Sequence, residues 1–287
     1  MHLRLRSALL FMLLLSAVPF SFSQEEMSPP PEKVASVLGQ NIHYFEAGQG
    51  PVVIFLHGLG AVKEVWLSSF GALPGKYHVY ALDQLGFGHS DKPLLDYKID
   101  TWVDFLQAFM QSQNIPKATL VGNSLGGWIA LDFAVQHPEM VDKLVLVDSA
   151  GLAWGQGSVN VPLNPSSIAE TRVLMQDLFY DKKLATDQFV LQVFTNHMRN
   201  NDGYTIQRTL ASFAQPKFED DSLKSIHAPT LVVWGRQDEL ISVSRAEKFH
   251  DGIAGSKLVI LEHCGHVPQI EKPAEFNQAL LGFLASR

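Results

Sequence analysis

One serine in this chain lies where its hydroxyl could act as a nucleophile. Ser124 stands in Gly-Asn-Ser-Leu-Gly-Gly, residues 122–127, between an apolar run at 118–121 and a stretch with helical patterning at 125–136. A G-x-S-x-G sequence between a strand and a helix is typical of a tight turn that presents the serine at the edge of a sheet. Glycine on both sides of the serine avoids side-chain clashes in that turn. We therefore predict Ser124 as a nucleophile.

A serine nucleophile needs a base, and the base needs an acid to orient it. Asp238 follows the apolar run 230–234, and His266 follows the run 257–261. The carboxyl ends of parallel strands share one edge of a sheet, so loops that are distant in sequence can meet there. The chain order serine, acid, histidine is also the one expected with a serine turn of this kind. We predict Asp238 as the acid and His266 as the base.

Each of these two roles has a second candidate. Asp148 also follows an apolar run, at 144–147, and could supply the acid. His263 lies close to the favoured histidine and could be the base. The Trp-Gly-x-x-Asp sequence favours Asp238 as the acid. The flexible Gly265, directly before the favoured histidine, favours that histidine over its neighbour.

Acyl transfer also needs hydrogen-bond donors for the negative charge that develops on the substrate oxygen. One donor is expected to be the backbone N–H of Leu125, directly after the serine. The loop His57-Gly58-Leu59-Gly60, which follows the apolar run 51–56, is expected to supply the N–H of Leu59. We interpret His57 as a histidine that packs this loop rather than as a catalytic group.

The elements that must position these residues alternate along the chain. Short apolar runs predict strands after an initial hairpin at 35–38 and 42–46, namely at residues 51–56, 78–82, 118–121, 144–147, 230–234 and 257–261. Helical patterns are found at 102–113, 125–136, 244–250 and 274–284. This alternation predicts an α/β fold whose mostly parallel sheet is covered by helices on both faces. The core is expected to span residues 33–151 and 224–287.

The stretch 152–223 interrupts the alternation. It begins with a glycine-rich loop and continues with helical patterns at 168–179, 187–198 and 204–213, which predict a helical insertion. The loop 83–90, Asp-Gln-Leu-Gly-Phe-Gly-His-Ser, has glycines that mark tight turns, and we interpret it as scaffold that supports the site.

The first 23 residues are typical of a signal peptide. Two arginines precede an apolar run at 8–20, and two small serines suit cleavage before Gln24. The run has about 13 residues, short of the roughly 20 that span a bilayer. We expect an exported protein, periplasmic or secreted, with no stable membrane insertion after cleavage; a retained anchor is the alternative. The polar, proline-rich residues 24–32 are expected to form a flexible lead-in.

Charge and composition exclude several classes of protein. The chain carries a net charge of −7, and 46% of its residues are hydrophobic. Because nucleic-acid binding depends on neutralising phosphates, we expect no nucleic-acid partner. The sequence has no motif for a metal or a cofactor, so we expect a small-molecule substrate and no cofactor. The one cysteine, Cys264, has no partner for an internal disulfide and is expected to fill space near the site. The sequence leaves the oligomeric state open.

In these motifs the chain resembles the α/β-hydrolase superfamily. HGLG, DQLGFGHS, GNSLGG, WGRQD and HCGH occur in the expected order, and the resemblance covers about residue 33 to the end. It implies an eight-stranded, mostly parallel sheet and a helical cap formed by the insertion. It also implies a serine, acid and histidine triad at Ser124, Asp238 and His266, with an oxyanion hole at Leu59 and Leu125.

Within the superfamily three activities remain open. Haloalkane dehalogenases and epoxide hydrolases have an aspartate at the position of Ser124, so the serine argues against both of these activities. The loop HGLGAVKEVW is similar to that of simple carboxylesterases, which favours hydrolysis of carboxylic esters of small to medium apolar substrates through an acyl-enzyme. GNSLGG and Leu178-Phe179-Tyr180-Asp181 resemble carbon–carbon hydrolases of the meta-cleavage type, although those usually carry HGxGPG. The third possibility is a ligand-binding receptor without turnover.

The insertion is expected to contribute to an apolar pocket. The side chains predicted to contact substrate are Trp154, Phe179, Phe194, Phe213 and Val267. A carbon–carbon hydrolase substrate would carry a carboxylate and need a basic anchor, for which the candidates are Arg172, Arg199 and Arg208.

Overall fold

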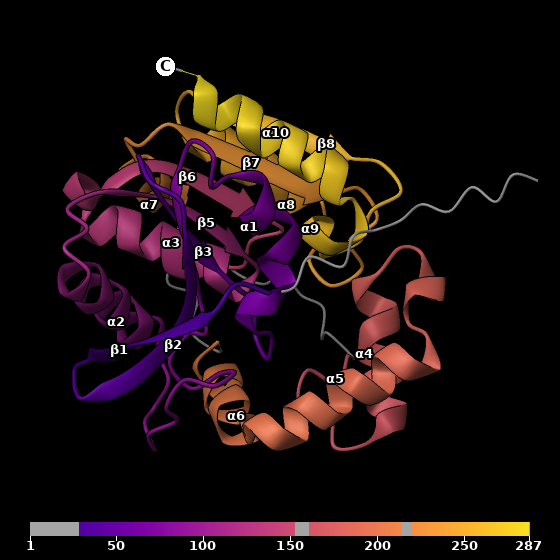
Figure 1. Ribbon diagram of the computed structural model, residues 1–287. Helices are drawn as coiled ribbons and strands as arrows, with labels where there is room; N and C mark the ends of the chain where they lie inside the picture. The colour runs from indigo at the N-terminus through magenta and orange to yellow at the C-terminus, as the bar shows by residue number, and fades with distance from the viewer. Residues whose placement is uncertain (1–28, 153–160, 214–219, 287) are drawn as a thin grey trace, which may run out of the picture.

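Eight strands form one sheet at the centre of the protein (Figure 1). The computed structural model describes residues 29–152, 161–213 and 220–286. The strand order is β1-β2-β4-β3-β5-β6-β7-β8. β1 pairs antiparallel with β2, and β2 pairs antiparallel with β4, whereas every other neighbouring pair is parallel. The predicted α/β fold with an eight-stranded, mostly parallel sheet is therefore confirmed.

The strands coincide closely with the predicted apolar runs. They are β1 (Glu32–Val37), β2 (Gln40–Ala47), β3 (Val52–Leu56), β4 (His78–Leu82), β5 (Ala118–Asn123), β6 (Val141–Val147), β7 (Thr230–Gly235) and β8 (Lys257–Leu261). Strand β1 already includes Glu32, which the sequence pattern assigned to the flexible lead-in. The predicted signal peptide, residues 1–23, lies outside the described residues.

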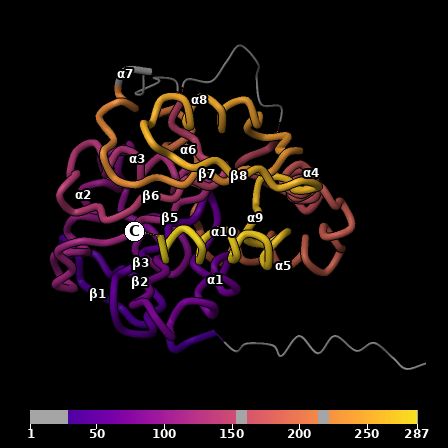
Figure 2. Tube along the Cα trace, turned by 90° about the horizontal axis from the view of Figure 1, so that it is seen from above, coloured from indigo at the N-terminus to yellow at the C-terminus, as the bar shows by residue number. Residues whose placement is uncertain are grey.

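Helices cover both faces of the sheet, and the two views in Figures 1 and 2 place α2, α3 and α8 on one face and α1 and α10 on the other. The helices of the core are α1 (Leu67–Ala72), α2 (Ile99–Ser112), α3 (Leu125–Gln136), α8 (Ser244–Gly252), α9 (Pro268–Glu271) and α10 (Pro273–Ala285), with short 3-10 turns η1 (Lys63–Trp66) and η2 (Pro138–Met140). The sequence pattern did not predict η1, η2, α1 or α9.

The sheet is buried on both faces, which explains why its strands are continuous apolar runs. Along β3, Ile54 and Leu56 belong to the apolar cluster that includes α2, α3 and α8. Val53 and Phe55 alternate with them and belong to the cluster that includes α1 and α10. The strands are therefore fixed in register from both sides, and so are the loops at their carboxyl ends.

Between β6 and β7 the chain forms several helices that we call the insertion (Figure 1). It contains α4 (Ile168–Leu178), η3 (Lys182–Leu184), α5 (Asp187–Asn200), α6 (Gly203–Ser212) and α7 (Asp220–Leu223). Of these, α4, α5 and α6 lie together, whereas α7 lies apart from them, against α8 (Figures 1 and 2). Within the described ranges, no helix is both long enough and apolar enough to cross a membrane.

An ionic network ties the edge strand β1 to the core. The Glu32 carboxylate accepts from Nζ of the buried Lys63 at 2.6 Å and from Nδ1 of His43 and His89 at 2.7 and 2.9 Å. Lys63 Nζ also lies 2.8 Å from Oδ2 of the buried Asp83. Partial burial opposes ionisation of Glu32, but these bonds outweigh it and lower the pKa of the carboxyl to about 2.

Because the folded pKa of Glu32 lies below its ordinary value of 4.5, its bonds stabilise the fold fully above that value and are lost as pH falls toward 2. We expect Glu32→Gln to unfold in less denaturant than the wild type at pH 5.5. The difference in the free energy of unfolding should narrow by pH 3. Denaturant titration at the two pH values measures it, with the exposed Glu247→Gln as control. A difference that stays constant between the two pH values would contradict the assignment.

Candidate active site

Ser124 lies at the turn between β5 and α3, as the motif predicts. Its backbone adopts φ 53° and ψ −115°, a conformation in which non-glycine residues are strained. The Ser124 amide donates to Val147 O at 3.0 Å, and its carbonyl accepts from the amides of Trp128 and Ala150 at 3.1 and 3.0 Å. Contacts with the end of β6 and the first turn of α3 thus hold the strained turn in place.

The glycines of the motif allow backbone to approach backbone in this turn. A Cβ at Gly122 would lie 2.2 Å from the carbonyl oxygen of Gly126. A Cβ at Gly126 would lie 2.2 Å from the carbonyl oxygen of Leu56, at the end of β3. A side chain at Gly126 would therefore push the nucleophile turn away from the end of β3, and one at Gly122 would push β5 away from the start of α3.

Asp238 and His266 form a hydrogen-bonded pair at the same edge of the sheet. Asp238, after β7, accepts from His266 Nδ1 at 2.7 Å, and both side chains are buried. The other Asp238 oxygen accepts from the amides of Leu240 and Ile241 at 2.8 and 2.9 Å. Three donors therefore stabilise the charge of this carboxylate.

The remaining ring nitrogen of His266 is free to act as a base. With Nδ1 donating to Asp238, the neutral ring carries its lone pair on Nε2, which is buried and has no partner among the described residues. The side-chain amide of Asn123 donates to the His266 carbonyl at 3.1 Å, which ties the histidine loop to the residue before the nucleophile. No hydrogen bond joins Ser124 Oγ to Nε2 in the described chain, so the hydroxyl must approach Nε2 during the reaction.

The two alternative residues occupy different positions. Asp148 lies at the end of β6 and accepts from the Gly235 amide at 2.9 Å, but it forms no hydrogen bond with His266. His263 is exposed, and its ring lies 5.4 Å from that of Tyr180. Of the candidate acids and bases, Asp238 and His266 are the two that the structure pairs.

The two amides predicted as oxyanion donors lie beside the serine. Leu125 is the first residue of α3, and Gly58, next to Leu59, is so close to the serine that a Cβ there would lie 3.3 Å from Ser124 Cβ. Neither the Leu59 nor the Leu125 amide donates to another part of the described backbone. Both are therefore available to a substrate oxygen.

His57 and the 83–90 loop support these donors. His57 is buried, donates from Nδ1 to Gly58 O at 2.7 Å and accepts at Nε2 from the Gln84 amide at 3.1 Å. These two bonds fix a neutral ring, and burial lowers the pKa of His57. Asp83 accepts from the Lys63 and His89 amides at 2.8 and 2.9 Å. Both features position the loop after β3.

Glu271, which the sequence analysis did not single out, joins the histidine loop to the insertion. Its carboxylate accepts from three amides, those of Gly265 at 2.6 Å, Tyr180 at 3.1 Å and Asp181 at 2.6 Å. The His266 amide donates to Leu178 O at 2.8 Å across the same contact. A carboxylate five residues after the histidine was the available sequence signal, but two of its three partners, Tyr180 and Asp181, lie about ninety residues earlier in the chain.

The side chains predicted to contact substrate lie in different environments. Phe179 and Val267 are buried together in an apolar cluster of the insertion, where Phe179 packs 5.9 Å from Phe189, ring to ring. The Phe213 ring lies 5.2 Å from that of Trp128, and Phe194 is half-buried on α5. Trp154 lies outside the described residues. Phe179 and Val267 thus join the insertion to the histidine loop.

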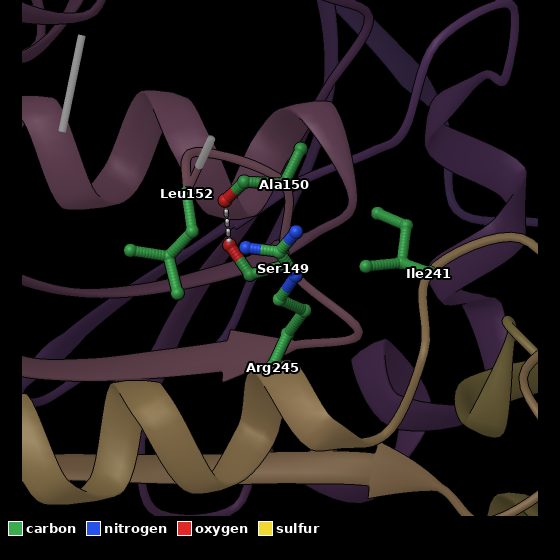
Figure 3. A pocket seen from close by; sticks show the side chains of 5 residues that line it. All are labelled: Ser149, Ala150, Leu152, Ile241 and Arg245. Carbon is green, nitrogen blue, oxygen red and sulfur yellow. Dashed lines mark hydrogen bonds between the residues drawn. The ribbon is translucent and has the colours of Figure 1, made fainter. Parts of the chain in front are cut away.

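A small hollow lies beside the segment after β6 (Figure 3). Its lining is formed by Ser149, Ala150, Leu152, Ile241 and Arg245. The Ser149 hydroxyl donates to Ala150 O at 2.7 Å, and the Ala150 amide bonds to the serine carbonyl. None of the described side chains predicted to contact substrate lines this hollow.

Two groups of side chains in the described residues have the composition of a metal site, but each is already bonded internally. In Glu32, His43 and His89 the carboxylate is bound by the Lys63 ammonium. In Asp148, Asp238 and His266 the ligand atoms lie within 4.8 Å of one another, and the group is fully buried around the acid–base pair. The second arrangement fits proton transfer, with the imidazole as base and a carboxylate to orient it.

An activated serine should react with a sulfonyl fluoride. We expect phenylmethylsulfonyl fluoride to label Ser124 alone, because its turn lies beside the His266–Asp238 pair. The Ser256 hydroxyl also lies 2.9 Å from a histidine nitrogen, His250 Nδ1, but that histidine has no carboxylate partner among the described hydrogen bonds and the hydroxyl bonds to the His250 carbonyl. His266→Ala should abolish labelling, whereas His263→Ala should leave it unchanged. Mass spectrometry of the digested protein locates the adduct; a label on another serine would overturn the nucleophile assignment.

Removing the Glu271 carboxylate leaves three amides without their acceptor. We expect Glu271→Ala to destabilise the fold by about 1–3 kcal/mol and to slow sulfonylation of Ser124, since the His266 loop loses its link to the insertion. Denaturant titration and the labelling rate measure the two effects. Glu275→Ala, on the exposed side of α10, is the control, and equal behaviour of the two variants would contradict the proposed link.

Comparison with known proteins agrees with this geometry. The family model described as alpha/beta hydrolase fold matches residues 51–273. The 2-hydroxy-6-oxo-6-(2'-aminophenyl)hexa-2,4-dienoic acid hydrolase of Metapseudomonas resinovorans is 33% identical over 92% of this chain and 94% of its own. Monoacylglycerol lipase ABHD6 of Homo sapiens is 29% identical over 83% of this chain and 77% of its own.

Solved structures give the same result. A meta-cleavage product hydrolase from Pseudomonas fluorescens IP01 superposes with a TM-score of 0.82 at 28% identity, over 88% of this chain and 97% of its own. The fold, the strained serine turn and the paired acid and histidine therefore identify this chain as a member of the alpha/beta hydrolase fold family, with hydrolase function.

Proposed function

We propose that the protein hydrolyses carboxylic esters of small to medium apolar substrates through an acyl-enzyme. The observation that carries the proposal is the His266–Asp238 pair beside the Ser124 turn. His266 Nε2 takes the proton of the Ser124 hydroxyl as the oxygen attacks the ester carbonyl. The Leu59 and Leu125 amides hold the resulting oxyanion.

The second half of the reaction uses the same groups. The Asp238 carboxylate stabilises the imidazolium, which gives its proton to the leaving alcohol. Water, with His266 again as base, then attacks the acyl-enzyme and releases the acid. We further propose that the insertion forms a cap over the site, that Phe194 and Phe213 contribute to its apolar wall, and that the protein is exported.

The state of the insertion's arginines favours a neutral ester over a substrate with a carboxylate. Arg172 donates to Asp187 at 2.7 Å, and Arg208 pairs with Asp96. Arg199 is exposed on α5. The arginines expected to anchor a carboxylate are therefore paired or solvent-facing, which supports the ester.

Carbon–carbon bond hydrolysis is the second candidate. It is supported by the relative from Metapseudomonas resinovorans and by the meta-cleavage product hydrolase structure, which match nearly the whole chain. The same triad could serve such a reaction, but the substrate's carboxylate would need a cation released from one of the ion pairs described above, or the exposed Arg199 turned toward the site.

A panel of p-nitrophenyl esters of increasing acyl length tests the proposal. We expect hydrolysis of short and medium chains, and a loss on the order of a million-fold in kcat in Ser124→Ala with an unchanged circular dichroism spectrum. A ring-fission dienoate, followed by its loss of colour, is the competing substrate. Turnover of the dienoate without ester hydrolysis would replace the proposal with the carbon–carbon reaction.

A further inference from the structure

A second buried carboxyl group lies against the acid of the triad. Asp148, at the end of β6, is 0% exposed. One of its carboxyl oxygens lies close to Asp238 and His266, because one ligand atom from each of the three residues falls within 4.8 Å of the others. Two carboxylates that share a buried site cannot both ionise, because each charge opposes the other.

The hydrogen bonds decide which of the two keeps the charge. Asp238 accepts three, from two amides and from the His266 ring. Asp148 accepts one, from the Gly235 amide to Oδ1, and its Oδ2 is buried without a donor among the described residues. A carboxylate with one donor is a much poorer anion than a carboxylate with three. The proton therefore belongs on Asp148, whose buried Oδ2 has no donor and can itself carry the hydrogen.

We propose that Asp148 is a neutral carboxylic acid that donates a hydrogen bond to the Asp238 carboxylate and so holds it in the orientation that His266 requires. Asp148 is a positioning residue, and the carboxyl groups of Asp148 and Asp238 together carry one proton and one negative charge. The proposal rests on Ser124 as nucleophile and not on the ester as substrate.

The surroundings of Asp148 support this assignment. Among the described residues its titratable neighbours include Asp238, His266, Cys264 and Glu271, and the Lys272 ammonium lies near Cys264. Burial, followed by the Asp238 carboxylate, raises the pKa of Asp148 well above its usual range. The chain also accepts a backbone φ of 41° at this residue, a strained region that Asp and Asn tolerate better than most residues.

Asparagine can therefore replace Asp148 without a change in backbone or in donor capacity. Its amide N–H₂ can donate to Asp238, and its oxygen can accept from Gly235 as before. Asp148→Leu has nearly the same shape but no donor, and its denaturant midpoint shows how much the fold loses because leucine is strained at a backbone φ of 41°. The two variants separate a hydrogen-bond donor from a space-filling group.

The rate at which a fluorophosphonate labels Ser124 measures nucleophile activation without any assumption about substrate. We expect Asp148→Asn to label at nearly the wild-type rate with an unchanged midpoint on the acid side of its pH profile. Asp148→Leu should label about ten- to a hundredfold more slowly, the cost of a hydrogen bond to a charged group. Denaturant titration shows whether each variant is folded.

The pH profile of Asp148→Asn is the decisive measurement. If Asp148 were ionised, its replacement would remove a negative charge beside His266, and the midpoint would move to lower pH. Such a shift would overturn the proposal, as would a folded Asp148→Leu that labels at the wild-type rate.

A double variant tests the shared charge. In Asp238→Asn, the remaining acid, Asp148, can ionise and keep the negative charge near His266. We expect Asp238→Asn to label at least about tenfold faster than Asp148→Asn/Asp238→Asn, which retains no carboxylate in the pair. Equal rates for the single and the double variant would contradict a charge shared by the two carboxyls.

Discussion

The hydrogen bond from the Ser124 amide to the Val147 carbonyl links the nucleophile to the neighbouring strand, and the rest of the site depends on it. It holds a residue with positive φ in place at the end of β5, at a cost that only a rigid setting can sustain. The setting is rigid because the parallel strands on either side are packed from both faces. The strand register that fixes Val147 also fixes the start of the loops after β6 and β7. Asp148 lies in the first of these loops and Asp238 in the second.

The insertion contributes to the site through backbone rather than through side chains alone. Residues 178–181 lie against the histidine loop so closely that a Cβ at Gly265 would lie 2.4 Å from Leu178 O. The His266 amide and the Glu271 carboxylate complete this contact. The position of the base is therefore set by two parts of the chain, the core strand before it and the insertion beside it.

The sequence predicted those features whose signal is local. The Ser124 turn, the strands and the edge loops with Asp238 and His266 each carry a motif or an apolar run, and the structure places them accordingly. The sequence could rank Asp148 and Asp238 as the candidate acid only by the residues next to them. The structural ranking depends on how many backbone amides donate to each carboxylate. Glu271 was missed for a similar reason: two of its three partners, Tyr180 and Asp181, belong to the insertion and lie far from it in the sequence.

The location of the chain's single cysteine makes its thiol a probe of how the segment around His266 opens. Cys264 is completely buried two residues before His266, the proposed base, and burial raises the pKa of its thiol, so the sulfur is both shielded and protonated. An alkylating reagent in water can reach it only when the segment around His266 opens. Its modification rate therefore reports how often this segment separates from the core, and an oxidising environment has little access to the sulfur while the loop is closed.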